Sequence, residues 1–132
     1  MHSQNYRERL KSLLRHCFPE ANIYDPLADH RDSLDYNEDQ GRSVFFRHNR
    51  MCGEVDIVVA FIPEASMGTA IEMWEAYQHG RTVITISPLN HNWVVRFCSH
   101  FVFADVEALE DALLTGDLVE RLKSRVAERD SL

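Results

Sequence analysis

Residues 55–77 read VDIVVAFIPEASMGTAIEMWEAY, and this stretch decides the fold of the chain. Val55 to Ile62 is almost purely apolar and rich in β-branched residues, which predicts a strand buried on both faces. Ser66 is a natural N-cap for the helix that follows, and Gly80 is a suitable residue just beyond its end. A buried strand that leads directly into a helix is typical of parallel α/β sheets.

Glu72 lies one turn inside this predicted helix and shares a face with Gly68 and Thr69. One turn is about 5.4 Å long, close to the reach from the 5'-phosphate of a nucleotide to its sugar C1'. A phosphate bound by the free N–H groups of the first turn would therefore leave Glu72 beside an anomeric carbon. An amphipathic helix with a capping serine and solvent-facing glutamates explains the same spacing without a ligand.

Outward from this stretch, helices and short strands alternate along the chain. The remaining predicted helices are residues 4–17, 38–52, 92–98, 106–114 and 117–128, and the remaining predicted strands are residues 21–24, 82–86 and 101–103. The polar stretch that follows Asp25 and Pro26, up to Asn37, predicts a loop. This order predicts one α/β domain over residues 1–132, with a doubly wound, mostly parallel sheet.

Ligands of such sheets bind beyond the carboxyl ends of the strands. The predicted turns at Asp25-Pro26, Pro63–Gly68 and Ser87–Asn92 therefore converge on one edge of the sheet.

Composition excludes several classes of protein. The 132 residues carry a formal net charge of −7 with a pI near 5.4, which argues against a surface for nucleic acid polymers. No apolar run approaches the roughly 20 residues that span a bilayer, so we expect no membrane partner. The absence of an apolar N-terminal segment predicts a cytoplasmic protein.

The cysteines and histidines do not predict a metal site. The three cysteines are far apart, without a CxxC pair, and we interpret them as buried thiols. His48 and Cys52 lie four residues apart, but no second pair accompanies them. We therefore expect neither a metal nor another cofactor.

A longer pattern resembles a known family. It comprises an Asp-led strand at Asp56–Ala60, the turn and helix Ser66–Glu72, Ala76, and a Gly-Arg before the strand in Gly80–Ile86. In this order the features resemble the nucleoside 2-deoxyribosyltransferase-like proteins, which include the deoxynucleoside 5'-monophosphate N-glycosidases. The resemblance extends over roughly residues 20 to 105, and the Ser-x-Gly-x-x-x-Glu spacing is its most specific part.

The resemblance implies a flavodoxin-like sheet and a defined activity. It implies that Glu72 is the nucleophile in cleavage of an N-glycosidic bond or in deoxyribosyl transfer, and that Ser66 with Gly68 holds a 5'-phosphate. A carboxylate suits this role because the transition state has oxocarbenium character at C1'. The substrate would be a small nucleoside or nucleotide.

The general acid is less well defined. In the family an acidic residue lies about 24 positions before the glutamate, and in this chain that position is His48. His48 could protonate the leaving base, since histidine titrates near neutrality, or it could be a structural histidine. Asp25 and Asp56 are the other candidates for the acid and for substrate contacts, although a residue such as Asp56 at the start of a strand is often structural.

Trp93 and Arg96 complete the candidate site. Trp93 follows a predicted strand end and could stack on a nucleobase, while Arg96 falls where family members place a polar residue that contacts phosphate, often across a dimer interface. A core aromatic and a solvated arginine are the alternative interpretations.

One feature of the family is absent. Its members begin with a central strand, whereas this chain begins with the predicted helix. We therefore expect that residues 21–24 pair directly with residues 55–62, or that a partner chain covers the open edge in a homodimer or larger homo-oligomer. The alternative to an enzyme is a non-catalytic nucleotide-binding or oligomeric interaction protein that retains the fold.

Overall fold

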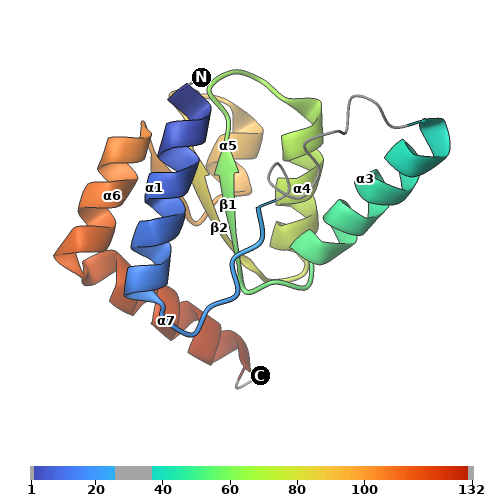
Figure 1. The fold of residues 1–132 in the computed structure, drawn as a ribbon. Coiled ribbons are helices and arrows are strands. Elements are labelled where there is room, and N and C mark those ends of the chain that lie inside the picture. The colour runs from blue at the N-terminus through green and yellow to red at the C-terminus, as the bar shows by residue number, and fades with distance from the viewer. Residues whose placement is uncertain (1, 26–36, 131–132) are drawn as a thin grey trace.

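The computed structural model describes residues 2–25 and 37–130, which form a parallel sheet between two layers of helices (Figure 1). The strands are β1 (Ile57–Phe61), β2 (Thr82–Ile86) and β3 (Phe101–Phe103), in the order β1-β2-β3. Both neighbouring pairs are parallel, with Ile57 opposite Thr82 and Ile84 opposite Phe101. The chain is thus of the predicted α/β class, and within the described residues the strand order contains no reversal.

Helices form wherever the periodicity predicts them, at closely similar bounds. They are α1 (His2–Cys17), α3 (Glu38–Cys52), α4 (Met67–Gln78), α5 (Trp93–Phe97), α6 (Val106–Thr115) and α7 (Asp117–Asp130). Asn37 begins α3 with a capping box, in which its side chain and that of Gln40 bond to each other's backbone N–H groups. Gly80 follows the end of α4 with a φ of 75°, as predicted for a residue that must adopt the left-handed region.

Alternate residues of β1 serve the two layers. Ile57, Val59 and Phe61 pack with buried side chains from α1, α6 and α7. Val58 and Ala60 pack on the other face with side chains from α4 and α5. This alternation follows from the two-residue period of a strand.

The sheet is buried most completely at its centre. Every residue of β2 is buried, whereas in β1 only Ala60 is. The prediction that residues 55–62 form a strand buried on both faces therefore holds only in part, because β1 lies at an edge of the sheet formed by the described strands.

The predicted strand at residues 21–24 was wrong. The Ala21 N–H donates to the Phe18 carbonyl at 3.0 Å, so Ala21 belongs to the turn after α1. Only Ile23 in this segment is half-buried and its neighbours are exposed, so the segment has too little apolar surface to join the sheet. Pro26 and the predicted loop to residue 36 lie outside the described residues.

The predicted pairing of this segment with β1 is therefore wrong as well. Across residues 2–25 and 37–130, β1 has a single strand neighbour, β2. No helix in these ranges is long and apolar enough to cross a membrane.

Candidate functional site

The amino end of α4 has the local structure that the sequence predicts. Ser66 is the N-cap, with extended backbone, and its Oγ accepts a hydrogen bond from the Thr69 N–H at 3.3 Å. The first N–H groups of a helix have no partner within the helix, so those of Met67 and Gly68 point out of its end. A Cβ placed on Gly68 would meet no atom within 4 Å, so the backbone there is open to a ligand.

A hollow of about 200 Å³ lies between α3 and the start of α4. The two helices pack against each other (Figure 1). The hollow is lined by α3 on one side and by the cap and first turns of α4 on the other. The lining residues are Phe45, His48, Asn49, Ser66, Gly68, Thr69 and Glu72. The structure thus brings His48 of α3 together with Ser66, Gly68 and Glu72, which the sequence had already grouped at the start of α4.

The Glu72 carboxylate is the chemically unusual group of this hollow. Its side chain is half-buried, and burial raises its pKa above the ordinary value of 4.5. Among the residues that the structure describes, no donor forms a hydrogen bond or ion pair with it. A carboxylate that is partly desolvated and unpaired is energetically costly, and such groups concentrate at functional sites.

His48 is held by a side chain from a distant part of the chain. Its Nε2 lies 2.9 Å from the Tyr24 hydroxyl, and the two rings meet edge to face with centroids 5.8 Å apart. The segment that was predicted as a strand therefore contributes Tyr24, which contacts His48 and helps to orient its imidazole.

The two other candidate acids lie outside the hollow. The Asp25 side chain is almost buried and forms ion pairs with Arg7 at 2.8 Å and Lys11 at 3.2 Å. These ion pairs hold the segment after α1 against that helix. Asp56 precedes β1, at the opposite end of the strand from Ser66, and pairs with Arg129 of α7. The structural interpretation of Asp56 is the better supported one.

Trp93 and Arg96 also lie outside the hollow. Trp93 begins α5 and is 74% exposed, with its ring against Phe97. The Arg96 guanidinium lies 5.1 Å from the centroid of the same Phe97 ring. Their predicted contacts with base and phosphate therefore have no support in the arrangement of α3 and α4.

The cysteines are half-buried rather than fully buried. Cys52 lies one turn beyond His48 on α3, and burial together with the nearby Glu72 and Glu75 charges raises its pKa to about 12. It is therefore a neutral thiol at neutral pH. In residues 2–25 and 37–130 no group of three or more His, Cys, Asp or Glu side chains could hold a metal ion.

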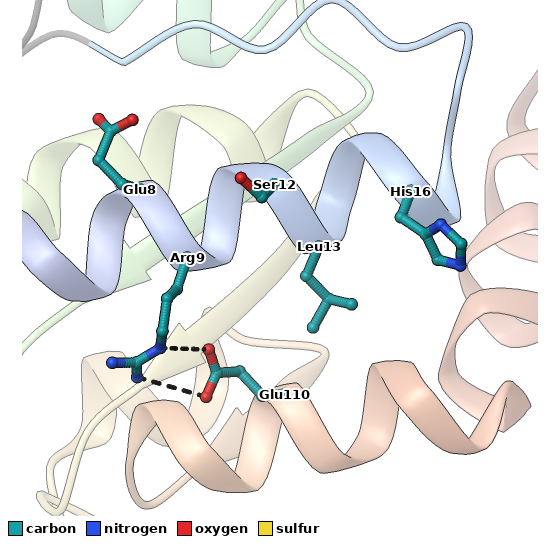
Figure 2. Close-up of a pocket in the computed structure, with 6 residues that line it drawn as sticks. All are labelled: Glu8, Arg9, Ser12, Leu13, His16 and Glu110. Atoms are coloured by element: carbon teal, nitrogen blue, oxygen red, sulfur yellow. Dashed lines mark hydrogen bonds and ion pairs between the residues drawn. The ribbon is translucent and has the colours of Figure 1, made fainter.

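A larger hollow, of about 600 Å³, lies between α1 and α6 on the other side of the sheet. Figure 2 shows that its polar side chains do not converge on one point: Arg9 reaches across to Glu110, at 3.1 Å, whereas Glu8 points away from α6. An ion pair that is already satisfied in an open groove offers no reactive group, so the hollow at Glu72 is the candidate site.

Sequence reasoning missed Asn49, which lines the hollow, and Tyr24, which contacts the lining residue His48. Asn49 lines the hollow beside His48, and its spacing of four from Phe45 could have placed it on the same helix face. Tyr24 had no comparable signal, because its contact with His48 joins segments that the sequence pattern does not relate.

Comparison of the chain with protein-family models, curated proteins and solved structures found no match.

Proposed function

We propose that the hollow between α3 and α4 binds a nucleoside or a nucleoside 5'-monophosphate and that Glu72 cleaves its N-glycosidic bond. The fold that supports this site is the parallel α/β sheet β1-β2-β3, and the proposal includes a deoxyribosyltransferase-like identity for that fold. The observation that carries the proposal is a half-buried carboxylate, without a partner among the described residues, one turn inside a helix whose capped N-terminus opens into the same hollow.

The phosphate would bind at the end of α4. The N–H groups of Met67 and Gly68, the Ser66 hydroxyl and the positive end of the helix dipole favour an anion there. Within residues 2–25 and 37–130 no lysine or arginine lines the hollow, so backbone N–H groups and the Ser66 hydroxyl would bind the phosphate. One turn along the helix, about 5.4 Å, the sugar C1' would then lie beside the Glu72 carboxylate.

The chemistry proceeds in two balanced steps. The Glu72 carboxylate forms a bond to C1' as the bond from C1' to the base nitrogen breaks, and the electron pair of that bond leaves with the base. The base takes up one proton, which His48 donates. Water, or a second base, then attacks C1', the bond from C1' to the Glu72 oxygen breaks, and the attacking group gives one proton back to His48, as in retaining glycosidases.

His48 is the best-placed proton donor, because it faces Glu72 across the hollow while the Tyr24 hydroxyl fixes its ring at 2.9 Å. Phe45 offers a ring and Asn49 offers an amide in the same wall. The hollow is smaller than the roughly 300 Å³ at which ligand pockets usually begin. We therefore expect the sugar and phosphate to fill it while the base lies against Phe45.

A nucleobase-release assay against a panel of nucleosides and 5'-monophosphates tests this proposal. Glu72→Gln keeps the volume and hydrogen-bonding capacity and removes the negative charge, so it should eliminate release while the chain stays folded. The matched control is Glu75→Gln on the same helix, because Glu75 points instead to Gln78 and His79. Glu75→Gln should keep wild-type turnover. Equal turnover in wild type and Glu72→Gln would disprove the catalytic assignment.

Calorimetry tests the phosphate subsite separately. A 5'-monophosphate should bind at least about tenfold more tightly than its nucleoside, since charge-assisted hydrogen bonds are worth about 1.5–3 kcal/mol. Ser66→Ala should remove most of that difference. If nucleoside and monophosphate bind equally, the phosphate interpretation is wrong.

The alternative is a non-catalytic nucleotide-binding protein with the same hollow. Binding of a nucleotide, without release of a base from any member of the panel, would support this alternative. In that case Glu72→Gln should strengthen binding of the monophosphate, because it removes a negative charge beside the phosphate.

A further inference from the structure

The start of β3 is held to β2 by a histidine that uses both its backbone and its side chain. The His100 N–H donates to the Val83 carbonyl at 2.8 Å, and the Val83 N–H donates to Nδ1 of the His100 imidazole at 3.0 Å. Val83 is completely buried in the middle strand of the described sheet, so its backbone groups have no water as an alternative partner. One residue therefore binds both polar backbone groups of Val83.

The imidazole occupies the position of a missing strand carbonyl. At the other end of the same strand pair, the Ser87 N–H donates to the Phe103 carbonyl at 2.8 Å. Bonds of this kind recur at every second residue of a parallel ladder, so the Val83 N–H would require the Ser99 carbonyl. Because β3 does not extend back to Ser99, the imidazole accepts the hydrogen bond instead.

This hydrogen bond fixes the protonation state of His100. A backbone N–H can only donate, so Nδ1 must carry a lone pair, and the proton of the neutral ring is on Nε2. His79 has the opposite arrangement, since its Nδ1 lies 2.8 Å from the Glu75 carbonyl oxygen and must donate. A second proton on His79 would leave its bond intact, whereas a second proton on His100 would remove the acceptor.

The surroundings of His100 disfavour a charged ring. Nε of Arg125, on α7, donates to the Thr82 hydroxyl at 3.2 Å, which holds the guanidinium at the start of β2. Arg121 of the same helix lies 5.0 Å from the centroid of the Phe101 ring. Burial, together with the charge of Arg125, lowers the pKa of His100 below its ordinary value of 6.5.

The ring also packs on α4. Its centroid lies 5.6 Å from that of the Tyr77 ring, with 29° between the two planes. The face of a tyrosine attracts a cation, so this contact alone would favour protonation, but the net shift of the His100 pKa is downward. In the described part of the chain no carboxylate forms an ion pair with His100, so no negative charge there would stabilise the imidazolium.

We propose that His100 is an acid-sensitive lock that holds the start of β3 against β2. The neutral ring completes the ladder, whereas a ring protonated on both nitrogens leaves the buried Val83 N–H without an acceptor and adds a positive charge beside Arg125. The stability from this lock is fully present above about pH 6.5, the pKa of an unfolded histidine. It is lost as the pH falls through the lower pKa of the folded state. The lock is independent of the hollow between α3 and α4.

Hydrogen exchange of the Val83 amide, followed by NMR on the purified full chain, tests this proposal. Protection is the ratio of the intrinsic exchange rate at each pH to the observed one. In the wild type it should fall at least about fivefold between about pH 7.5 and about pH 4.5, because the buried donor loses its acceptor. Nitrogen spectra of the His100 ring should show Nδ1 gaining a proton over the same range.

Asparagine is the matched substitution for His100. Its Oδ1 follows Cγ as Nδ1 does and accepts a hydrogen bond, but it does not titrate. His100→Asn should therefore keep the protection of Val83 at both pH values. His100→Phe keeps a ring against Tyr77 without an acceptor, so Val83 should be weakly protected at both. His91, which is exposed and lies outside the strands, provides the control, and His91→Asn should lose protection in acid as the wild type does.

The comparison of the wild type with His100→Asn decides the proposal even if His100→Phe does not fold. An equal loss of Val83 protection in these two proteins would overturn it, because other groups would then cause the acid effect. A His100 ring that carries its proton on Nδ1 at neutral pH would overturn it as well.

Discussion

Two neighbouring leucines of α6 test the packing of this fold with almost identical chemistry. Leu113 is 2% exposed and belongs to the core cluster beneath α1, α6 and α7, whereas Leu114 is 69% exposed. The substitutions Leu113→Ala and Leu114→Ala remove the same atoms from adjacent positions of one helix. Helix propensity changes equally in both, so the difference between the two variants measures burial alone.

The expected difference is large. Truncating a buried leucine loses roughly 2.4 kcal/mol of transfer free energy, at about 0.8 kcal/mol for each carbon group, and the cavity that remains raises the cost to about 3 kcal/mol. Leu114→Ala should change the free energy of unfolding by no more than about 0.5 kcal/mol. A chain of 132 residues has a stability of roughly 7–20 kcal/mol, so Leu113→Ala should remain folded.

Urea unfolding followed by circular dichroism measures this difference. With a slope of about 1.5 kcal/mol/M, the midpoint of Leu113→Ala should fall by about 2 M relative to Leu114→Ala. The slopes of the two variants should agree, which shows that the substitutions change stability and not the unfolded state. Midpoints that lie within about 0.3 M of each other would refute the arrangement of α6 on the sheet.

Three further predictions concern single residues. Burial raises the pKa of Glu72 in the folded state. The stability that this carboxyl contributes is therefore fully present below its pKa in the unfolded state, and it is lost as the pH rises through its higher pKa in the folded state. Glu72→Gln should therefore match the wild type in urea titrations near about pH 4 and exceed it at about pH 7, and equal stabilities at both pH values would contradict the burial argument. Gly80→Ala should lower the free energy of unfolding by about 1 kcal/mol, because Gly80 has a positive φ. Gly41→Ala should raise it by about 0.5 kcal/mol, because Gly41 lies inside α3 and a Cβ there would meet no atom within 4 Å. Thermal unfolding measures both changes, and the reverse order would exclude the turn described for Gly80. Because the pKa of Cys52 is raised to about 12, a variant with Cys52 as its only cysteine should react with a disulfide reagent far more slowly when folded than when denatured, and equal rates would show that the thiol is not buried.

The elements that sequence predicts best are those whose signal is local. The apolar run that includes β1 and the cap at Ser66 each lie within a few residues, so strand, turn and helix were found at nearly the observed bounds. The half of the candidate site that α4 supplies followed from the same local spacing. The strand prediction for residues 21–24 failed because a short segment with Ile23 and Tyr24 satisfies a strand pattern without having a place in the sheet.

In the half of the site that α3 supplies, only His48 was predicted as a site residue, and it came from the family resemblance rather than from local spacing. Asn49 and Phe45 line the hollow because α3 lies against α4, and that packing is decided by the sheet and the core rather than by either helix alone. Tyr24 reaches His48 only after the chain has turned at the end of α1. Asp25 shows the opposite error, because it was predicted as a site residue but lies outside the hollow. Its carboxylate forms ion pairs with Arg7 and Lys11 of α1.

The two walls of the hollow are anchored to the protein to very different degrees. On α4, Met73 and Ala76 are completely buried, but α3 contains no buried residue. Helix α3 can therefore detach from α4 at a much smaller free-energy cost than opening of the sheet requires, and amide hydrogens along α3 should exchange with solvent long before those of β2. A ligand that needs both walls would bind only the docked fraction of molecules, so its apparent affinity would be set partly by the Asn37 capping box, far from any atom that the ligand touches.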